Sequence, residues 1–160
     1  MAKCGVHVVE LLASKVRGKQ IEAKEWPVEN HLGGGGGMVV CNFPTLDLTV
    51  AHIHLGLPTK KFFYKQIKHT KTILKKLKGK LILMGDFNEG YDNIKKHFPT
   101  LILVTGRVRT CSFTPIIRWF LCKDMDHILV RGLKKRGVGT FFGRSDHKLI
   151  WADLESINRK

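Results

Sequence analysis

Short apolar runs separated by polar segments dominate the chain and predict a protein rich in strands. In the run at 46–55, Leu46, Leu48 and Val50 alternate with Asp47 and Thr49, which is typical of a strand with one buried face. The expected strands cover residues 6–12, 38–43, 46–55, 81–88, 101–105, 125–132, 137–143 and 147–154.

Two segments have helical rather than strand-like periodicity. In residues 60–79, Phe63, Ile67, Leu74 and Leu77 recur at helical spacing and Gly79 marks the end, so an amphipathic helix is predicted there. Its opposite face carries Lys60, Lys61, Lys65, Lys68, Lys71, Lys75, Lys76 and Lys78. Such a face could hold phosphates, but a run of charge on a helix is more often simply solvated. A shorter helix is expected at about 91–98.

Five consecutive glycines at 33–37 interrupt the N-terminal part of the chain. A run of this kind does not hold regular structure cheaply, so it predicts a flexible loop. A phosphate-binding glycine loop is the weaker interpretation, because no Gly-Lys-Ser/Thr sequence follows. No repeat or domain boundary is apparent, and a single domain over residues 1–160 is expected.

Charge narrows the class of partner. The chain has 160 residues, of which 43% are apolar, and its 28 Lys and Arg against 13 Asp and Glu give a net charge of +15. Such a balance favours a polyanion, either nucleic acid or an anionic membrane surface.

Neither a membrane span nor a secretory signal is expected from the sequence. No apolar run approaches the roughly 20 residues needed to cross a bilayer. Glu10 interrupts the short N-terminal apolar stretch, so we expect an intracellular protein, cytoplasmic or nuclear. The four cysteines lack Cys-x-x-Cys spacing and are expected to be reduced thiols in the core.

Polar side chains stand at the ends of four apolar strands, in "HIHLG" (52–56), "GDFN" (85–88), "MDHILV" (125–130) and "SDHKLI" (145–150). Each has an ordinary structural explanation, such as a turn residue or a loop cap. Burying several carboxylates is costly unless they are paired or bind a metal, so together the four segments predict one common site. Along a strand, Asp86 and Asn88 would leave on the same side, with Phe87 turned the other way.

The ordered set of these motifs resembles the endonuclease/exonuclease/phosphatase superfamily, over about residues 38 to 155. The combination of GDFN with a later SDH is specific, whereas either alone is weak. The resemblance implies an α/β fold with two mainly antiparallel sheets packed as a sandwich and helices on the outside. It also implies hydrolysis of phosphate esters.

The resemblance also assigns catalytic roles. His147 matches the histidine that deprotonates water or supports the transition state, and Asp126 matches the carboxylate that orients it. A carboxylate suits this role because it fixes the tautomer of the imidazole and stabilises its charged form. Asp86 and Asn88 match the residues that position the nucleophile and the scissile phosphate, and His54 matches a phosphate contact.

Metal and substrate ligands follow from the same resemblance. Asp146 matches a metal-side carboxylate, and a carboxylate-rich site implies Mg²⁺ or Mn²⁺ rather than zinc. Thr110 and Arg118 are expected substrate contacts, although Arg118 is at least as well explained as a surface arginine. Trp119 and Trp151 are better explained as core residues than as platforms for bases.

The N-terminal side departs from the family pattern. Members usually run to about 250 residues, and the opening strand with its Asn and the Gln-Glu metal motif have no clear equivalents here. The segment 6–12 resembles the family's second strand, which makes Glu10 the expected metal ligand, with Glu22, Glu25 and Glu29 as rivals. The abbreviated sheet would have an open edge, through which a homodimer is expected to form.

These observations predict a Mg²⁺-dependent nuclease in which water attacks phosphorus in line. The expected partner is DNA or RNA rather than a membrane. Two alternatives stay open, namely a lipid or inositol phosphate hydrolase of the same superfamily, and a catalytically impaired domain that binds nucleic acid by charge.

Overall fold

The computed structural model describes residues 22–27, 37–56, 60–110, 124–141 and 147–157. The strand expected at 6–12 and glycines 33–36 lie outside these ranges, whereas Gly37 begins a strand.

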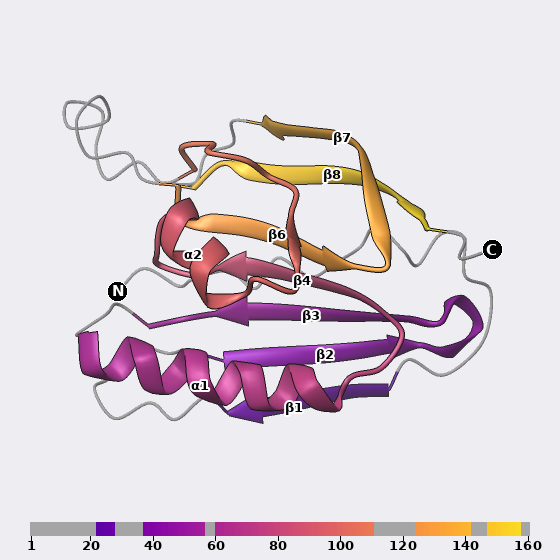
Figure 1. Cartoon of the computed structure of the whole chain (residues 1–160), viewed down its shortest axis with the longest axis horizontal. Coiled ribbons are helices and arrows are strands. Elements are labelled where there is room, and N and C mark those ends of the chain that lie inside the picture. The colour runs from indigo at the N-terminus through magenta and orange to yellow at the C-terminus, as the bar shows by residue number, and fades with distance from the viewer. Residues whose placement is uncertain (1–21, 28–36, 57–59, 111–123, 142–146, 158–160) are drawn as a thin grey trace.

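A mixed six-stranded sheet forms the centre of the fold (Figure 1). Its strands, in spatial order, are β1 (Glu22–Pro27), β2 (Gly37–Phe43), β3 (Leu48–His54), β4 (Lys80–Asp86), β6 (Asp126–Arg131) and β5 (Ile102–Leu103). All neighbours are antiparallel except β3 and β4. The parallel pair needs a crossover, which α1 (Lys60–Lys76) supplies.

Both helices pack on one face of this sheet. The helix α1 ends close to the predicted stop at Gly79, whose φ of 72° places it in the left-handed region, and Phe63, Ile67 and Leu74 are buried as expected. The second helix, α2 (Tyr91–His97), contributes Ile94 to the same core. Within the described residues, no helix combines the length and the apolar character that a membrane span needs.

A two-stranded antiparallel sheet packs on the other face. It consists of β7 (Leu133–Phe141) and β8 (Leu149–Ser156). A second apolar cluster joins the two sheets and contains Ile128 and Val130 from β6, Ile82 and Met84 from β4, and Ile150, Ala152 and Leu154 from β8. The expected α/β class is therefore confirmed, with one six-stranded and one two-stranded sheet.

Several elements differ from the sequence prediction. The strand expected over 137–143 begins four residues earlier, at Leu133, and the one expected over 101–105 is limited to Ile102–Leu103. The strand β1 was not predicted, because Glu-Ala-Lys-Glu-Trp-Pro lacks apolar alternation; it forms through its hydrogen-bonded ladder with β2. The strand expected from residue 46 begins instead at Leu48, because Pro44–Leu46 form a 3₁₀ turn that ends at left-handed Asp47.

The strand ends that carry the polar motifs meet at one edge of the fold, on the left in Figure 1. His54 ends β3 and lies opposite Asp86, which ends β4. Asp86 in turn lies opposite Asp126, the first residue of β6. The register therefore brings the ends of β3, β4 and β6 together. His147, just before β8, joins them through its contact with Asp126.

Candidate active site

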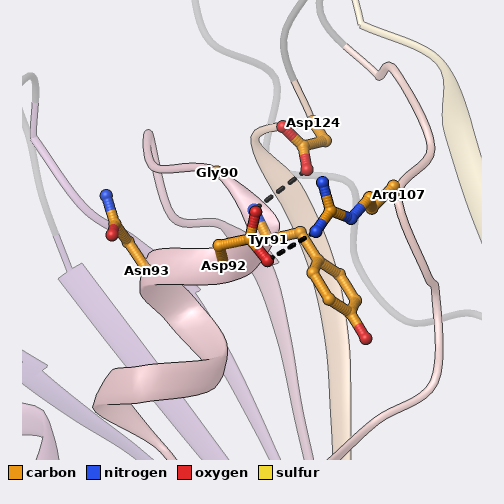
Figure 2. A pocket seen from close by; sticks show the side chains of 6 residues that line it. All are labelled: Gly90, Tyr91, Asp92, Asn93, Arg107 and Asp124. Atoms are coloured by element: carbon orange, nitrogen blue, oxygen red, sulfur yellow. Dashed lines mark hydrogen bonds and ion pairs between the residues drawn. The ribbon is translucent and has the colours of Figure 1, made fainter.

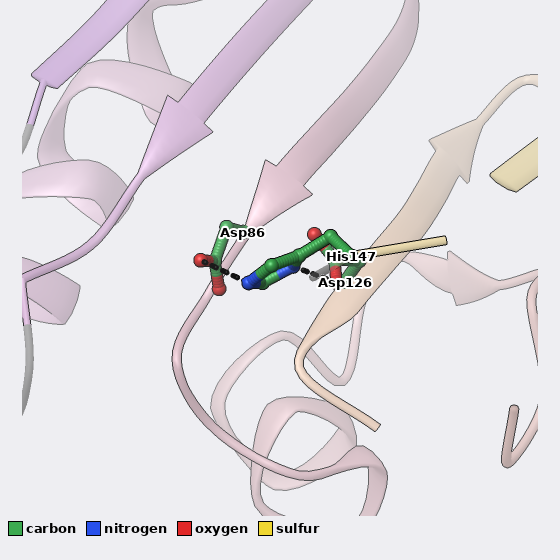
Figure 3. Close-up of side chains that lie close together, drawn as sticks. All are labelled: Asp86, Asp126 and His147. Atoms are coloured by element: carbon green, nitrogen blue, oxygen red, sulfur yellow. Dashed lines mark hydrogen bonds and ion pairs between the residues drawn. The ribbon is translucent and has the colours of Figure 1, made fainter. Parts of the chain in front are cut away.

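Three side chains from three different segments converge at this edge (Figure 3). Asp86, Asp126 and His147 each place one candidate ligand atom within 4.8 Å of the others. All three are half-buried. The convergence predicted from the four polar strand ends is therefore found for these residues.

The imidazole of His147 is held by Asp126. Its Nδ1 lies 2.8 Å from Oδ2 of Asp126, a hydrogen-bond distance. When Nδ1 carries the proton and donates it to this carboxylate, Nε2 of the neutral ring is an acceptor. That Nε2 faces Oδ2 of Asp86 across 4.0 Å. The His147–Asp126 pair thus orients the proton-accepting Nε2 of His147 toward Asp86, at the end of β4.

A second imidazole approaches the same carboxylate. Nε2 of His54 lies 3.8 Å from Oδ2 of Asp86. This separation, like that to His147, is too long for a direct hydrogen bond. A single oxygen atom beside Asp86 can lie within hydrogen-bond distance of both the carboxylate and His147. The edge therefore has the spacing of a site for water or a phosphate oxygen.

Burial dominates the electrostatics of Asp86. The side chain is only 20% exposed, and desolvation raises the pKa of its carboxyl above the ordinary range. The backbone amide of Asn88 opposes this rise in pKa, while the nearby charge of Asp126 adds to it. A carboxylate that is costly to ionise and faces two imidazoles is a characteristic feature of a functional site.

Asn88 reaches the site through a tight turn rather than through strand alternation. The strand ends at Asp86, and the backbone N–H of Asn88 donates to Oδ1 of Asp86 at 2.8 Å. Its Nδ2 donates to the carbonyl of Leu55 at 2.6 Å, and its φ is 50°. Phe87 points the other way and is fully buried, as predicted.

Gly85 allows β3 to approach the end of β4 closely. Its φ of 138° is one that residues with a side chain rarely adopt. A Cβ atom at this position would lie 1.9 Å from the carbonyl oxygen of Ile53. The glycine of the GDFN motif is therefore required to bring His54 next to Asp86.

Other predicted site residues are buried beside this edge, lie away from it, or fall outside the described ranges. Thr110 is fully buried, and its hydroxyl faces backbone amides. Glu22 and Glu25 lie on β1, separated from β4 by two strands. The remaining predicted residues, Glu10, Glu29, Arg118, Trp119 and Asp146, fall outside the described ranges.

Trp151 is not a core residue, so that expectation was wrong. Its side chain is 44% exposed on β8. The indole lies over Gly139 of β7, where a Cβ atom would come within 2.7 Å of the ring. The glycine leaves room for the indole on the outer face of the hairpin, away from the cluster that joins the two sheets.

His127 is a structural residue of the site that the sequence analysis did not single out. It is fully buried, and its Nε2 lies 2.9 Å from the carbonyl of Glu89 in the loop that follows Asn88. Burial lowers its pKa, which favours the neutral ring. Strand alternation was the available signal, since it turns His127 to the face opposite Asp126.

The start of α2 is anchored to the chain that leads into β6. Oδ2 of Asp124 accepts a hydrogen bond from the backbone N–H of Tyr91 at 2.9 Å, and Arg107 pairs with Asp92 at 2.8 Å (Figure 2). These side chains, together with Gly90 and Asn93, line a polar pocket. The anchoring fixes the loop between β4 and α2, and with it Asn88.

The donor chemistry at this edge fits a hard divalent cation. Mg²⁺ binds one or two carboxylates and keeps several waters. Asp86 offers such a carboxylate, whereas the side-chain amide of Asn88 is bonded through Nδ2 to the carbonyl of Leu55. Asp126 is already engaged by His147. Asp86 is therefore the residue best suited to hold the ion.

Three solved structures illustrate the similarity of fold. D. rerio TDP2 complexed with single-strand DNA product has a TM-score of 0.63 and 13% identity, and the match covers 85% of this chain and 68% of that one. The human Nocturnin catalytic domain with bound sulfate has a TM-score of 0.62 and 18% identity, and the match covers 87% of this chain and 60% of that one. A mannosyl-6-phosphatase of Bacteroides thetaiotaomicron has a TM-score of 0.58 and 17% identity, and the match covers 85% of this chain and 67% of that one.

The chain thus spans 60% to 68% of the length of these structures, and at such low identity the likeness establishes the fold alone. A comparison with curated protein sequences found no significant match. The model of the endonuclease/exonuclease/phosphatase family matches residues 7–147, most of the sequence. Fold, motifs and family model agree, and the chain belongs to the endonuclease/exonuclease/phosphatase family.

Proposed function

We propose that this protein is a Mg²⁺-dependent phosphodiester hydrolase that cleaves nucleic acid by in-line attack of water. The observation that carries the proposal is the pair of His147 and Asp126, joined at 2.8 Å, with Nε2 of the imidazole facing Asp86 across 4.0 Å. Membership of a family named for nucleases and phosphatases supports the reaction class.

Each side chain has a definite task in this reaction. His147 accepts the proton of the attacking water at Nε2, and Asp126 stabilises the imidazolium that forms. Asp86 and Asn88 position the water and the phosphate, and His54 donates to a phosphate oxygen. Asp86, with Glu10 and Asp146 as further ligands, would hold Mg²⁺ or Mn²⁺, which would supply positive charge to offset the negative charge that grows on the phosphate.

The proposed domain extends over residues 1–160 as a two-sheet α/β sandwich with its helices outside. The helices on one face of the six-stranded sheet and the β7–β8 hairpin on the other support it. Arg118 is retained as a substrate contact on the strength of the family resemblance. A homodimer through an open sheet edge stays a prediction, which the mass of the protein in solution would test.

Nucleic acid is the proposed substrate because of the charge distribution. The helix α1 begins at the same end of the fold as the candidate site (Figure 1) and contains no acidic residue. Lys65, Lys68 and Lys75 are exposed on it, and in the part of the chain that the structure describes no carboxylate forms an ion pair with them. Such lysines can neutralise backbone phosphates.

The triple variant Lys65→Gln, Lys68→Gln, Lys75→Gln is expected to bind single-stranded DNA more weakly, with a lower salt dependence. If each lysine contacts one phosphate, the slope of log K against log salt should fall by about 2. Fluorescence anisotropy over a series of NaCl concentrations measures both quantities.

A control variant with the same loss of charge separates local contact from net charge. Lys134→Gln, Lys135→Gln, Arg136→Gln removes three exposed cations from β7 instead. Its salt slope should stay close to that of the wild type. Equal changes in the two variants would show that only the total charge matters, and would contradict a binding role for α1.

Cleavage of plasmid and single-stranded DNA should require Mg²⁺ or Mn²⁺ and should stop on addition of EDTA. Gel electrophoresis before and after chelation, with Mg²⁺ restored in a final step, measures this dependence. DNA binding without any metal-dependent cleavage would favour the impaired nucleic-acid-binding domain. Release of phosphate from lipid or inositol phosphates, with DNA left intact, would favour the other hydrolase class.

A further inference from the structure

Thr110 connects the two halves of the catalytic pair through their backbones. Its side chain is fully buried. The hydroxyl oxygen accepts hydrogen bonds from the backbone N–H groups of Met125 at 3.1 Å and Asp126 at 3.0 Å. The carbonyl oxygen of Thr110 accepts a third bond, at 2.8 Å, from the backbone N–H of Lys148.

These contacts lie at the positions that determine where the pair sits. Asp126 is the first residue of β6, where the ladder with β4 begins, and Lys148 directly follows His147. One residue therefore holds the backbone on both sides of the bond between Nδ1 of His147 and Oδ2 of Asp126. The hydroxyl faces these amides and is not accessible to a substrate.

We propose that Thr110 is a positioning residue that sets the geometry of the His147–Asp126 pair by holding both backbones. The expected effect of Thr110 on the rate of hydrolysis rests on the proposed function, whereas its effect on the geometry of the His147–Asp126 pair does not. Thr110 acts through Asp126 and His147, and it touches neither water nor phosphate. It therefore affects the turnover of bound substrate rather than substrate affinity.

Valine and serine separate the hydroxyl from the shape of the side chain. Thr110→Val keeps the branched shape and removes the acceptor, which leaves two buried N–H groups without a partner. Thr110→Ser keeps the acceptor and removes only a methyl group. If the hydrogen bonds of the hydroxyl set the geometry of the His147–Asp126 pair, Thr110→Ser should keep that geometry and Thr110→Val should lose it.

Thr105, five residues before Thr110 in the segment that follows β5, provides a control. It is 2% exposed, and its hydroxyl accepts a longer bond, at 3.4 Å, from the backbone N–H of Ile128. Thr105→Val removes a similar bond to β6, two residues beyond Asp126. It should lower stability without disturbing the pair.

Steady-state hydrolysis of DNA is the first measurement. Thr110→Val should lower kcat by about 10- to 100-fold, the range typical of residues that orient a catalytic group, with KM unchanged. Thr110→Ser and Thr105→Val should keep kcat within about twofold of the wild type. If Thr105→Val lowers kcat as much as Thr110→Val, the effect is one of general stability and the proposal is overturned.

A proton NMR measurement tests the geometry without relying on catalysis. The Nδ1 proton of an imidazole bonded to a carboxylate resonates at low field and exchanges slowly with water. This signal of His147 should be present in the wild type, in Thr110→Ser and in Thr105→Val, and absent in Thr110→Val. Its persistence in Thr110→Val, or its absence from the wild type, would overturn the proposal. A lack of DNA hydrolysis together with the expected NMR pattern would reject the proposed function alone.

Discussion

Replacement of His147 with alanine is expected to lower kcat for DNA cleavage by about 1,000-fold, within the range found for loss of a general base. Affinity for DNA should stay within about twofold, because the lysines that meet the backbone are unchanged. Single-turnover cleavage measures the rate and fluorescence anisotropy measures the binding. The large effect on rate follows because no other described imidazole is bonded to a carboxylate at this edge.

His69→Ala is a suitable control for this experiment. His69 is exposed on α1 and takes no part in the proposed chemistry. Its removal should leave kcat unchanged. Full activity of His147→Ala would contradict the assignment of the general base, whereas equal losses in both variants would indicate a general effect of removing a histidine.

Replacement of Asp86 with asparagine is expected to reduce cleavage by about 1,000-fold or more, because it removes a charge that the transition state requires. The fold should persist, since the amide oxygen of asparagine can accept the hydrogen bond that Asn88 donates to Oδ1 at 2.8 Å. In metal-free buffer at neutral pH the variant should melt at a higher temperature than the wild type. Differential scanning calorimetry with and without Mg²⁺ measures this change.

The sign of the stability effect follows from the raised pKa of Asp86, which has burial as its main cause. A carboxyl with a raised pKa in the folded protein stabilises the fold fully below the ordinary aspartate pKa of about 4. This contribution is lost as the pH rises through the raised pKa. At neutral pH the wild type therefore bears the cost of ionising Asp86, and the asparagine variant does not.

The same pKa predicts the acid limb of the pH–rate profile. Cleavage requires ionised Asp86 as well as an unprotonated Nε2 on His147, so activity should fall with decreasing pH. The contribution of Asp86 to this fall should appear at a higher pH than for an ordinary aspartate. Higher Mg²⁺ concentration should move this limb to lower pH, because the cation favours the carboxylate form. An acid limb that does not respond to Mg²⁺ would contradict a metal contact at Asp86. Asp92→Asn, an exposed residue paired with Arg107, is the matched control.

Local periodicity predicted the central elements well. The spacing of Phe63, Ile67 and Leu74 predicted α1, and the apolar run before Asp86 predicted β4. These elements bury one face or both, so the spacing of their apolar residues is enough to predict whether they form a helix or a strand. The site residues at the ends of these strands were predictable because several strands end in polar groups, and such ends were expected to meet in one common site.

The features that were missed depend on contacts between distant segments. The edge strand β1 forms through hydrogen bonds to β2 that leave no apolar pattern. Asn88 approaches Asp86 through a turn with positive φ, whereas strand alternation predicts an extended backbone there. The burial of Thr110 and the exposure of Trp151 depend on what packs beside them, which the sequence does not specify at these positions.

A crystal grown with Mn²⁺ would test the central claim most directly, because the anomalous scattering of the ion reveals its position. The account predicts a peak within coordination distance of a carboxylate oxygen of Asp86. The peak should be lost in Asp86→Asn. An absence of bound Mn²⁺ at this edge, or a peak elsewhere on the protein that Asp86→Asn does not affect, would contradict a metal-dependent hydrolytic site at Asp86, Asp126 and His147.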